Sequence, residues 1–174
     1  MATSALKSTS LTNLALTPPT KATVGEGAAG PLRSVNDHVT AVDADAVGST
    51  YKFVRIPSNA KVKHLFFEAG AMTAGKVNVG LYYSTDNDGT QPSLQGTAVD
   101  AAFFASDVDL ASAVAITDIV NESGSYTADK RNEPIWQAAG LSSDPGGFFD
   151  VVATVHTTAI TTGALMGVEA QYVE

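Results

Sequence analysis

Hydrophobic and polar residues alternate most regularly in residues 51–83. In segment 76–83, apolar residues occupy every second position and alternate with Asn, Gly and Tyr, which is the period of a strand with one buried face. Segments 51–56 and 62–69 also have strand character, and the turn Pro57-Ser58-Asn59-Ala60 joins them. Segment 62–69 carries large apolar residues at both odd and even positions, which predicts burial on both of its faces. The stretch therefore predicts three successive strands.

The rest of the chain predicts further strands and one short helix. Strands are expected at residues 34–42, 101–105, 115–120, 148–156 and 164–173. Residues 107–113 read as one helical turn or an irregular crossing. The helix is expected at about residues 134–139, because proline suits a first turn and Gly140 suits a C-terminal cap. Its inward-facing residues are expected to be Ile135, Trp136 and Ala139. Seven or eight strands with one helix predict an antiparallel β-sandwich or jelly roll.

Residues 1–34 show neither period and contain isolated leucines, Pro18-Pro19 and a Gly/Ala cluster. We interpret this segment as an extended N-terminal arm, and residues 35–174 as the β-sandwich domain. Composition alone is also typical of a disordered terminus. A polar arm of this length cannot bury itself, so we favour an arm bound to another chain. The expected partner-binding residues are Leu6, Leu11, Leu14, Leu16, Val24 and Leu32.

Charge narrows the choice of partners. Charged residues make up 16% of the 174-residue chain, against about 25% in an average soluble domain, and a surface short of charge often packs against other subunits. Residues 1–34 hold three basic side chains and one acidic one, whereas residues 35–174 hold seven basic and seventeen acidic ones. So acidic a domain is a poor ligand for nucleic acid or for anionic membranes. No stretch has the roughly 20 apolar residues of a membrane span, and no signal peptide is expected.

Metal sites are not predicted. The chain has no cysteine, which excludes disulfides and thiolate ligands. The sequence Asp86-Asn87-Asp88-Gly89 is similar to the start of a calcium loop, but the twelfth position is Thr97 where the EF-hand pattern needs Glu. A turn is the simpler interpretation. The three histidines, His38, His64 and His156, are dispersed in the sequence, and their spacing does not predict a metal site.

Catalytic motifs are also missing. The chain has no G-x-S-x-G sequence, the signature of a nucleophile elbow. The carboxylates Asp107, Asp109 and Asp118 are spaced for a solvated strand edge and not for a glycosidase pair. We therefore expect no catalytic residues, no cofactor and no enzymatic activity.

Two stretches resemble virion structural proteins of tailed bacteriophages. RIPSNAKVKHLFFEAG, residues 55–70, is similar to a strand–Pro turn–strand block of these proteins. EPIWQAAGLSSDPGGFFDVVATVHTTAITTGALMGVEAQYV, residues 133–173, is similar to their usual ending, in which a helix, an Asp-Pro-Gly-Gly break and two strands follow one another. The intervening stretch FFASDVDLASA, residues 103–113, also resembles the sequences of these proteins. The resemblance implies a jelly-roll sandwich on or in a phage particle, and it offers no active-site residues.

On this basis the sequence predicts a capsid decoration (cement) or minor head protein. Its expected partners are the major capsid protein or other virion proteins, and homo-oligomers are expected, with a trimer favoured over a dimer. Its expected location is the virion, assembled in the cytoplasm of the bacterial host. The alternative is a tail- or fibre-associated module that binds a host glycan through loops 85–97 and 121–132, with Tyr126 and Trp136 as stacking residues. An enzyme is the third and least favoured hypothesis.

Overall fold

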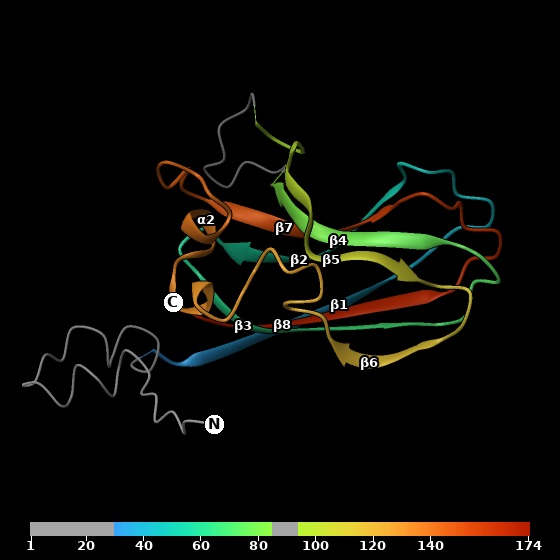
Figure 1. Ribbon diagram of the computed structural model, residues 1–174, viewed down its shortest axis with the longest axis horizontal. Helices are drawn as coiled ribbons and strands as arrows, with labels where there is room; N and C mark the ends of the chain where they lie inside the picture. The colour runs from blue at the N-terminus through green and yellow to red at the C-terminus, as the bar shows by residue number, and fades with distance from the viewer. Residues whose placement is uncertain (1–29, 85–93) are drawn as a thin grey trace, which may run out of the picture. The chain divides into compact units, whose positions relative to one another are not determined.

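The computed structural model describes residues 30–84 and 94–174, and its compact unit is Leu32–Glu174. Within the described residues, eight strands form two four-stranded sheets (Figure 1). The strands are β1 (Leu32–Thr40), β2 (Thr50–Pro57), β3 (Lys61–Ala69), β4 (Lys76–Tyr83), β5 (Ala98–Asp109), β6 (Val114–Asp118), β7 (Phe148–Val155) and β8 (Leu165–Val173). Between β6 and β7 lie a 3-10 turn, η2 (Lys130–Asn132), and a one-turn helix, α2 (Ile135–Ala138).

The strand order is β1-β8-β3-β6 in one sheet and β2-β7-β4-β5 in the other. The first strand pairs with the last, the second with the seventh, the third with the sixth and the fourth with the fifth. All of these pairs are antiparallel. A long hairpin of eight strands rolled into two facing sheets has this order, and it is the arrangement of a jelly roll. The predicted fold class, a mainly β antiparallel sandwich, is confirmed.

The core lies between the two sheets, which Figure 1 shows as two layers. Leu65 and Phe67 from β3 and Val79, Leu81 and Val151 from the opposite sheet are fully buried. In β3 the buried residues alternate with more exposed ones from His64 onward, as a period of two predicts. In β4 and β7 the residues between them, such as Gly80 and Val152, are buried as well.

Most predicted strands lie close to the observed ones, but two differ. The first was expected at 34–42, whereas β1 begins at Leu32 and ends at Thr40. The strand expected at 101–105 is β5, which extends from Ala98 to Asp109. Of the two alternatives for residues 107–113, the helical turn is wrong, because residues 107–109 are strand and residues 110–113 are irregular. Asp107 remains in the strand with a φ of 51°, because its N–H donates to Asn78 Oδ1 of β4 at 2.8 Å.

The prediction that both faces of β3 are buried is wrong. The pairing of β3 with β8 shifts register between Val62 and His64. This bulge brings Val62 onto the same buried side as Leu65, although an unbroken strand would place them on opposite faces. Phe66 is left half-buried on the outer face.

Strand β5 makes an unusual crossing over β4. Leu81 pairs with Asp100, and Val79 pairs with Ala105. Between these two pairs the chain advances five residues along β5 but only two along β4. The extra residues lie against the backbone of Gly80. A Cβ atom at Gly80 would stand 2.1 Å from the Asp100 carbonyl oxygen, so this close approach requires glycine.

The helix α2 closes one end of the sandwich. The N–H of Ile135 donates to the Ala60 carbonyl at 2.8 Å, and the N–H of Trp136 donates to the Ser58 carbonyl at 3.3 Å. The helix is thereby fixed to the turn between β2 and β3. Ile135 is buried as predicted, whereas Trp136 and Ala139 are only half-buried and Ala138 takes the other inward position.

Candidate interaction surface

The outer face of the β1-β8-β3-β6 sheet is the surface with the clearest shape. The pairing registers align Asn36 of β1, Glu169 of β8, Phe66 of β3 and Asp118 of β6 in one row across the sheet. Side chains in such a row project from the same face. The sheet therefore presents a mixed row of polar, acidic and aromatic groups.

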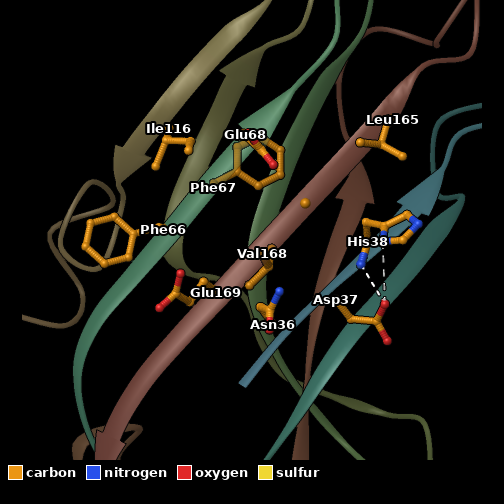
Figure 2. Close-up of a pocket in the computed structure, with 11 residues that line it drawn as sticks. Asn36, Asp37, His38, Phe66, Phe67, Glu68, Ile116, Leu165, Val168 and Glu169 are labelled. Carbon is orange, nitrogen blue, oxygen red and sulfur yellow. Dashed lines mark hydrogen bonds and ion pairs between the residues drawn. The ribbon is translucent and has the colours of Figure 1, made fainter. Parts of the chain in front are cut away.

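The neighbouring row contains a gap. His38 pairs with Gly167, which in turn pairs with Glu68. Because Gly167 has no side chain, a hollow of about 230 Å³ opens between the flanking strands (Figure 2). Residues from all four strands line it: Asn36, Asp37, His38, Phe66, Phe67, Glu68, Ile116, Leu165, Gly167, Val168 and Glu169. A Cβ atom at Gly167 would contact Glu68, 3.0 Å from its Oε1.

Part of the hollow is apolar. Ile116 of β6 is 70% exposed and Leu165 of β8 is 46% exposed, and these strands flank β3 on its two sides. The half-buried ring of Phe66 lies between them on β3. Exposed apolar side chains gathered around a depression indicate a contact surface more strongly than single scattered ones.

The rim of the hollow is acidic. Glu68 and Glu169 supply two carboxyl groups on this face, whereas Asp37 pairs with the inward-facing Val168 and so belongs to the opposite face of the sheet. The Glu169 Oε1 accepts hydrogen bonds from Gln171 Nε2 at 2.9 Å and from Ser34 Oγ at 2.8 Å. These two bonds, that of Gln171 first, lower the pKa of Glu169. Glu169 therefore keeps its negative charge at neutral pH.

A histidine–carboxylate pair stands beside the hollow. His64 Nδ1 lies 2.7 Å from Asp118 Oδ2, and the His64 ring stacks on Phe66 with centroids 5.7 Å apart. Burial acts to raise the pKa of Asp118, but the hydrogen bonds from His64 and from the N–H groups of Val120 and Leu65 outweigh it, so the pKa is lowered. The pair fixes the end of β6 to β3.

A second histidine–carboxylate pair lies at the ends of β5 and β7. His156 Nδ1 lies 2.8 Å from Asp107 Oδ1, and the Thr157 hydroxyl donates to the same oxygen at 3.1 Å. Both bonds lower the pKa of Asp107. In a catalytic triad the hydroxyl donates to the imidazole, whereas here it donates to the carboxylate. The cluster is therefore suited to holding two chain segments together and not to nucleophilic catalysis.

The sequence-predicted residues have different outcomes. Leu32 begins β1 opposite Val173 and is 60% exposed. The other arm residues and the sequence Asp86-Asn87-Asp88-Gly89 lie outside the described residues. The three histidines pair with three different aspartates: His38 with Asp37, His64 with Asp118 and His156 with Asp107.

Over ranges 30–84 and 94–174, no group of three or more potential metal ligands is found. No helix in these ranges is long and apolar enough to cross a membrane.

The stacking role considered for Tyr126 is wrong. Its side chain is fully buried, its ring packs against Phe103 and Phe104, and its hydroxyl donates to the Val62 carbonyl at 2.9 Å. Tyr126 thus anchors the β6–β7 connection, to which it belongs, in the core. Trp136 is half-buried against the same core. Tyr126 therefore offers no ring face to a glycan.

The hollow itself was not predicted from the sequence. Its signal is the alternation in LMGVEAQYV of β8, where the residues at 165, 167, 169 and 171 face outward. A glycine within an outward series marks a depression only when the neighbouring strands are known. The pairing of β8 with both β1 and β3 joins residues more than 90 positions apart, and no local pattern predicts it.

No protein-family model matches the chain, and no curated protein matches it. Among solved structures, the chain is similar to one titled "Cyanophage Pam1 capsid asymmetric unit", with 17% sequence identity and a TM-score of 0.49. The similarity covers 86% of this chain and 90% of that chain. At this identity and TM-score it carries no weight for function.

Proposed function

We propose that this chain is a non-enzymatic structural protein of a tailed-bacteriophage virion, of the capsid decoration or minor head type. The observation that carries the proposal is the jelly-roll strand order in a chain whose blocks 55–70 and 133–173 resemble such proteins. A fold alone does not define a function. The outer sheet face adds support, because its hollow is lined by acidic and apolar groups suited to holding another chain.

The proposed mechanism is mechanical. The sandwich serves as a stable body, and residues 1–34 serve as the attachment arm to the major capsid protein or another virion protein. The isolated apolar residues of the arm would bind at intervals along grooves or sheet edges of the partner. Many weak contacts on one homo-oligomer, a trimer in the favoured case, give tight attachment through avidity. The acidic domain makes nucleic acid an unsuitable partner.

Intact particles test the proposal directly. Phage particles are purified, and the copies of this chain per particle are counted by quantitative mass spectrometry, with the chain then located by electron cryomicroscopy. A shell protein is expected in hundreds of copies on the head. A location restricted to fibres, together with binding on a glycan array, would overturn the proposal in favour of a glycan-binding module. Absence from purified particles would contradict both.

A further inference from the structure

We propose that a cluster of basic side chains at the start of β3 and on η2 binds an acidic segment of another protein. This cluster, the basic patch, consists of Lys61, Lys63, Lys130 and Arg131. The inference goes beyond the proposed function, which assigns attachment to residues 1–34, because the basic patch lies on the sandwich domain itself.

The basic patch gathers most of the positive charge of an acidic domain. Residues 35–174 hold seven basic and seventeen acidic side chains. Four of the seven basic side chains belong to the patch, so the rest of the domain holds three basic and seventeen acidic ones. All four residues of the patch are half-buried. So uneven a distribution creates a local positive potential on a molecule whose overall charge is negative.

A β-bulge directs Lys63 into the patch. The register of β3 with β8 shifts between Val62 and His64, which makes Lys63 the extra residue, and a bulge changes the direction of a side chain. The Lys63 ammonium donates to the Arg131 carbonyl oxygen at 2.7 Å and to the Asn132 Oδ1 at 2.9 Å. These bonds join the bulge to η2 and bring the cations of the two elements together.

The cations of the patch repel one another. Burial, and then the positive charges of Lys61 and Arg131, lower the pKa of Lys63. Across residues 30–84 and 94–174, no carboxylate forms an ion pair with Lys63, Lys130 or Arg131. An anion from another molecule would supply the missing counter-charge and remove part of this repulsion.

The opposite sheet shows how the same domain neutralises cations internally. Asp150 of β7 lies 2.8 Å from Arg55 and 3.6 Å from Lys52, both of β2. One buried carboxylate thus serves two neighbouring cations. The basic patch differs from this arrangement, because its three residues at 63, 130 and 131 share no such carboxylate within the described ranges.

Arg131 has the largest unused hydrogen-bonding capacity in the patch. Within the described ranges, no residue accepts a hydrogen bond from its guanidinium, whose Nε is buried. A guanidinium carries five N–H donors in a planar fork, which binds a carboxylate through two parallel hydrogen bonds. The half-buried side chain of Arg131 is therefore the group of the patch best suited to orient a bound carboxylate.

The charge around the patch favours a protein carboxylate over a chain of phosphates. Guanidinium and ammonium groups bind both anions, so the patch alone does not separate them. A nucleic acid carries phosphates along its whole length and would extend over the acidic remainder of the domain, which repels it. A short acidic peptide segment places a few carboxylates on the patch and ends there.

A second copy of this chain is a weaker candidate for the same reason. Each chain has a net charge of −8, and two molecules of like net charge repel each other. A partner whose negative charge is confined to one short segment is not opposed in this way. The proposal therefore commits to an acidic segment of a different protein.

A peptide titration of the full-length chain tests the site. The probe is a synthetic peptide of alternating Glu and Ser, and the reference is the same peptide with Gln in place of Glu. Two-dimensional NMR of the backbone amides, recorded at low ionic strength, locates the binding and gives its Kd. We expect the largest chemical-shift changes around Lys63 and Arg131, and no binding of the neutral peptide.

Charge removal identifies the residues that bind. Arg131→Gln leaves the contact of Lys63 with the backbone oxygen in place and is expected to weaken peptide binding about threefold, because charge-assisted hydrogen bonds are lost. Lys63→Gln/Arg131→Gln is expected to weaken it about tenfold. The matched control Lys52→Gln/Lys76→Gln removes the same charge from the other sheet and is expected to bind as the wild type does. Circular dichroism checks that each variant is folded.

Several results would overturn the proposal. The first is an acidic peptide that does not bind, or that binds Arg131→Gln and the double variant as tightly as the wild type. The second is an oligonucleotide of equal charge that binds the patch more tightly than the peptide, which would assign the patch to phosphate. The third is self-association that the double variant abolishes in sedimentation velocity, which would assign the patch to a second copy. None of these measurements uses phage particles, so their failure is separate from a failure of the proposed virion role.

Discussion

The imidazole Nδ1 of His64 lies 2.7 Å from the Asp118 Oδ2 and joins β3 to the short edge strand β6. The other oxygen of the same carboxylate accepts hydrogen bonds from the N–H groups of Leu65 at 3.2 Å and Val120 at 3.1 Å. One partly buried side chain therefore makes two contacts that hold β6 to β3, with His64 and Leu65, and a third contact, with Val120, that orders the turn after β6. Because β6 carries Ile116, the pair also fixes one wall of the hollow.

The first prediction concerns the charge of Asp118. In Asp118→Asn the amide oxygen can still accept from the backbone, but the negative charge of the group that pairs with His64 is lost. We expect a loss of about 1–2 kcal/mol in the free energy of unfolding at pH 7, reduced from the value for a buried charged hydrogen bond because the side chain is 31% exposed. Urea unfolding followed by circular dichroism measures it. Asp109→Asn makes the same chemical change at a carboxylate bonded to the Ala111 N–H and serves as the control.

The same difference is expected to depend on pH. The pKa of Asp118 is lowered from its ordinary value of 3.8 in the folded protein. The stabilisation by the carboxylate is thus complete above the unfolded pKa and disappears as the pH falls through the lower folded pKa. The wild type and Asp118→Asn should differ at pH 7 and converge in the acid range below about pH 4. A difference that stays constant down to pH 2 would contradict a charge-dependent contact.

The second prediction concerns the buried hydroxyl of Tyr126. Burial raises the pKa of this phenol, which therefore stays protonated and donates to the Val62 carbonyl. Tyr126→Phe removes the donor and leaves a buried carbonyl without it, so we expect a loss of about 1–2 kcal/mol in unfolding free energy. Tyr126→Ala also opens a cavity beside Phe103 and Phe104 and should cost about 3–5 kcal/mol. Guanidinium unfolding of the three proteins measures the order. Equal stability of Tyr126→Phe and the wild type would show that the hydrogen bond makes no net contribution.

The third prediction concerns the close approach of β5 to β4. Gly80→Ala places a methyl group where the Asp100 carbonyl and the Ala101 backbone already stand. Since these are backbone atoms of an adjacent strand, they cannot move aside without disturbing the pairing, and we expect a loss of about 3 kcal/mol. The control is Gly167→Ala, whose methyl group meets only the Glu68 side chain and should cost about 1 kcal/mol or less. Thermal unfolding compares the two, and equal costs would mean that β5 shifts freely over Gly80.

The sequence predicted strand positions well where local alternation is unbroken. In β4 the predicted bounds agree with Lys76–Tyr83 and residues 77, 79 and 81 are buried, but Asn78, Gly80 and Tyr82 are buried too, so the expectation of a single buried face is wrong there. The predictions failed where a register shift interrupts the alternation. In β3 the bulge after Val62 changes which face the later residues occupy, and in β5 the excess residues opposite Gly80 hide a twelve-residue strand. These irregularities depend on the partner strand, and a single sequence does not contain that information in local form.

The candidate surface was even less accessible to sequence reasoning. Its residues come from four strands whose order, β1-β8-β3-β6, joins the start of the domain to its end. The carboxylates Asp107 and Asp118 lie on the edge strands β5 and β6 and are partly exposed, as expected. Their pairing with His156 and His64 was not predicted. Contacts between residues about 50 positions apart in the sequence follow from the strand order and not from residue spacing.

The last prediction concerns the arm and its boundary. We expect deletion of residues 2–29 to leave the unfolding midpoint of the domain unchanged and to reduce binding to particles that lack this protein at least tenfold. Ordering one flexible residue costs about 1–2 kcal/mol of backbone entropy, so only extensive contacts with a partner can hold a segment of this length. Each buried leucine or valine contributes roughly 1.5–3 kcal/mol toward that cost. Leu11, Leu14 and Leu16 changed together to Ser should reproduce most of the loss.

The structure also supplies an internal control for this deletion. Residues 32–34 belong to β1, where Leu32 pairs with Val173 and the Ser34 hydroxyl donates to Glu169 at 2.8 Å. Extending the deletion from 29 to 34 removes the first third of an edge strand, so we expect it to lower the thermal midpoint, whereas the shorter deletion does not. Particle occupancy measured by quantitative gel analysis separates the two effects. Full occupancy by the protein lacking residues 2–29 would mean that attachment resides on the sandwich, and the sheet face around Gly167 would then be the first surface to mutate.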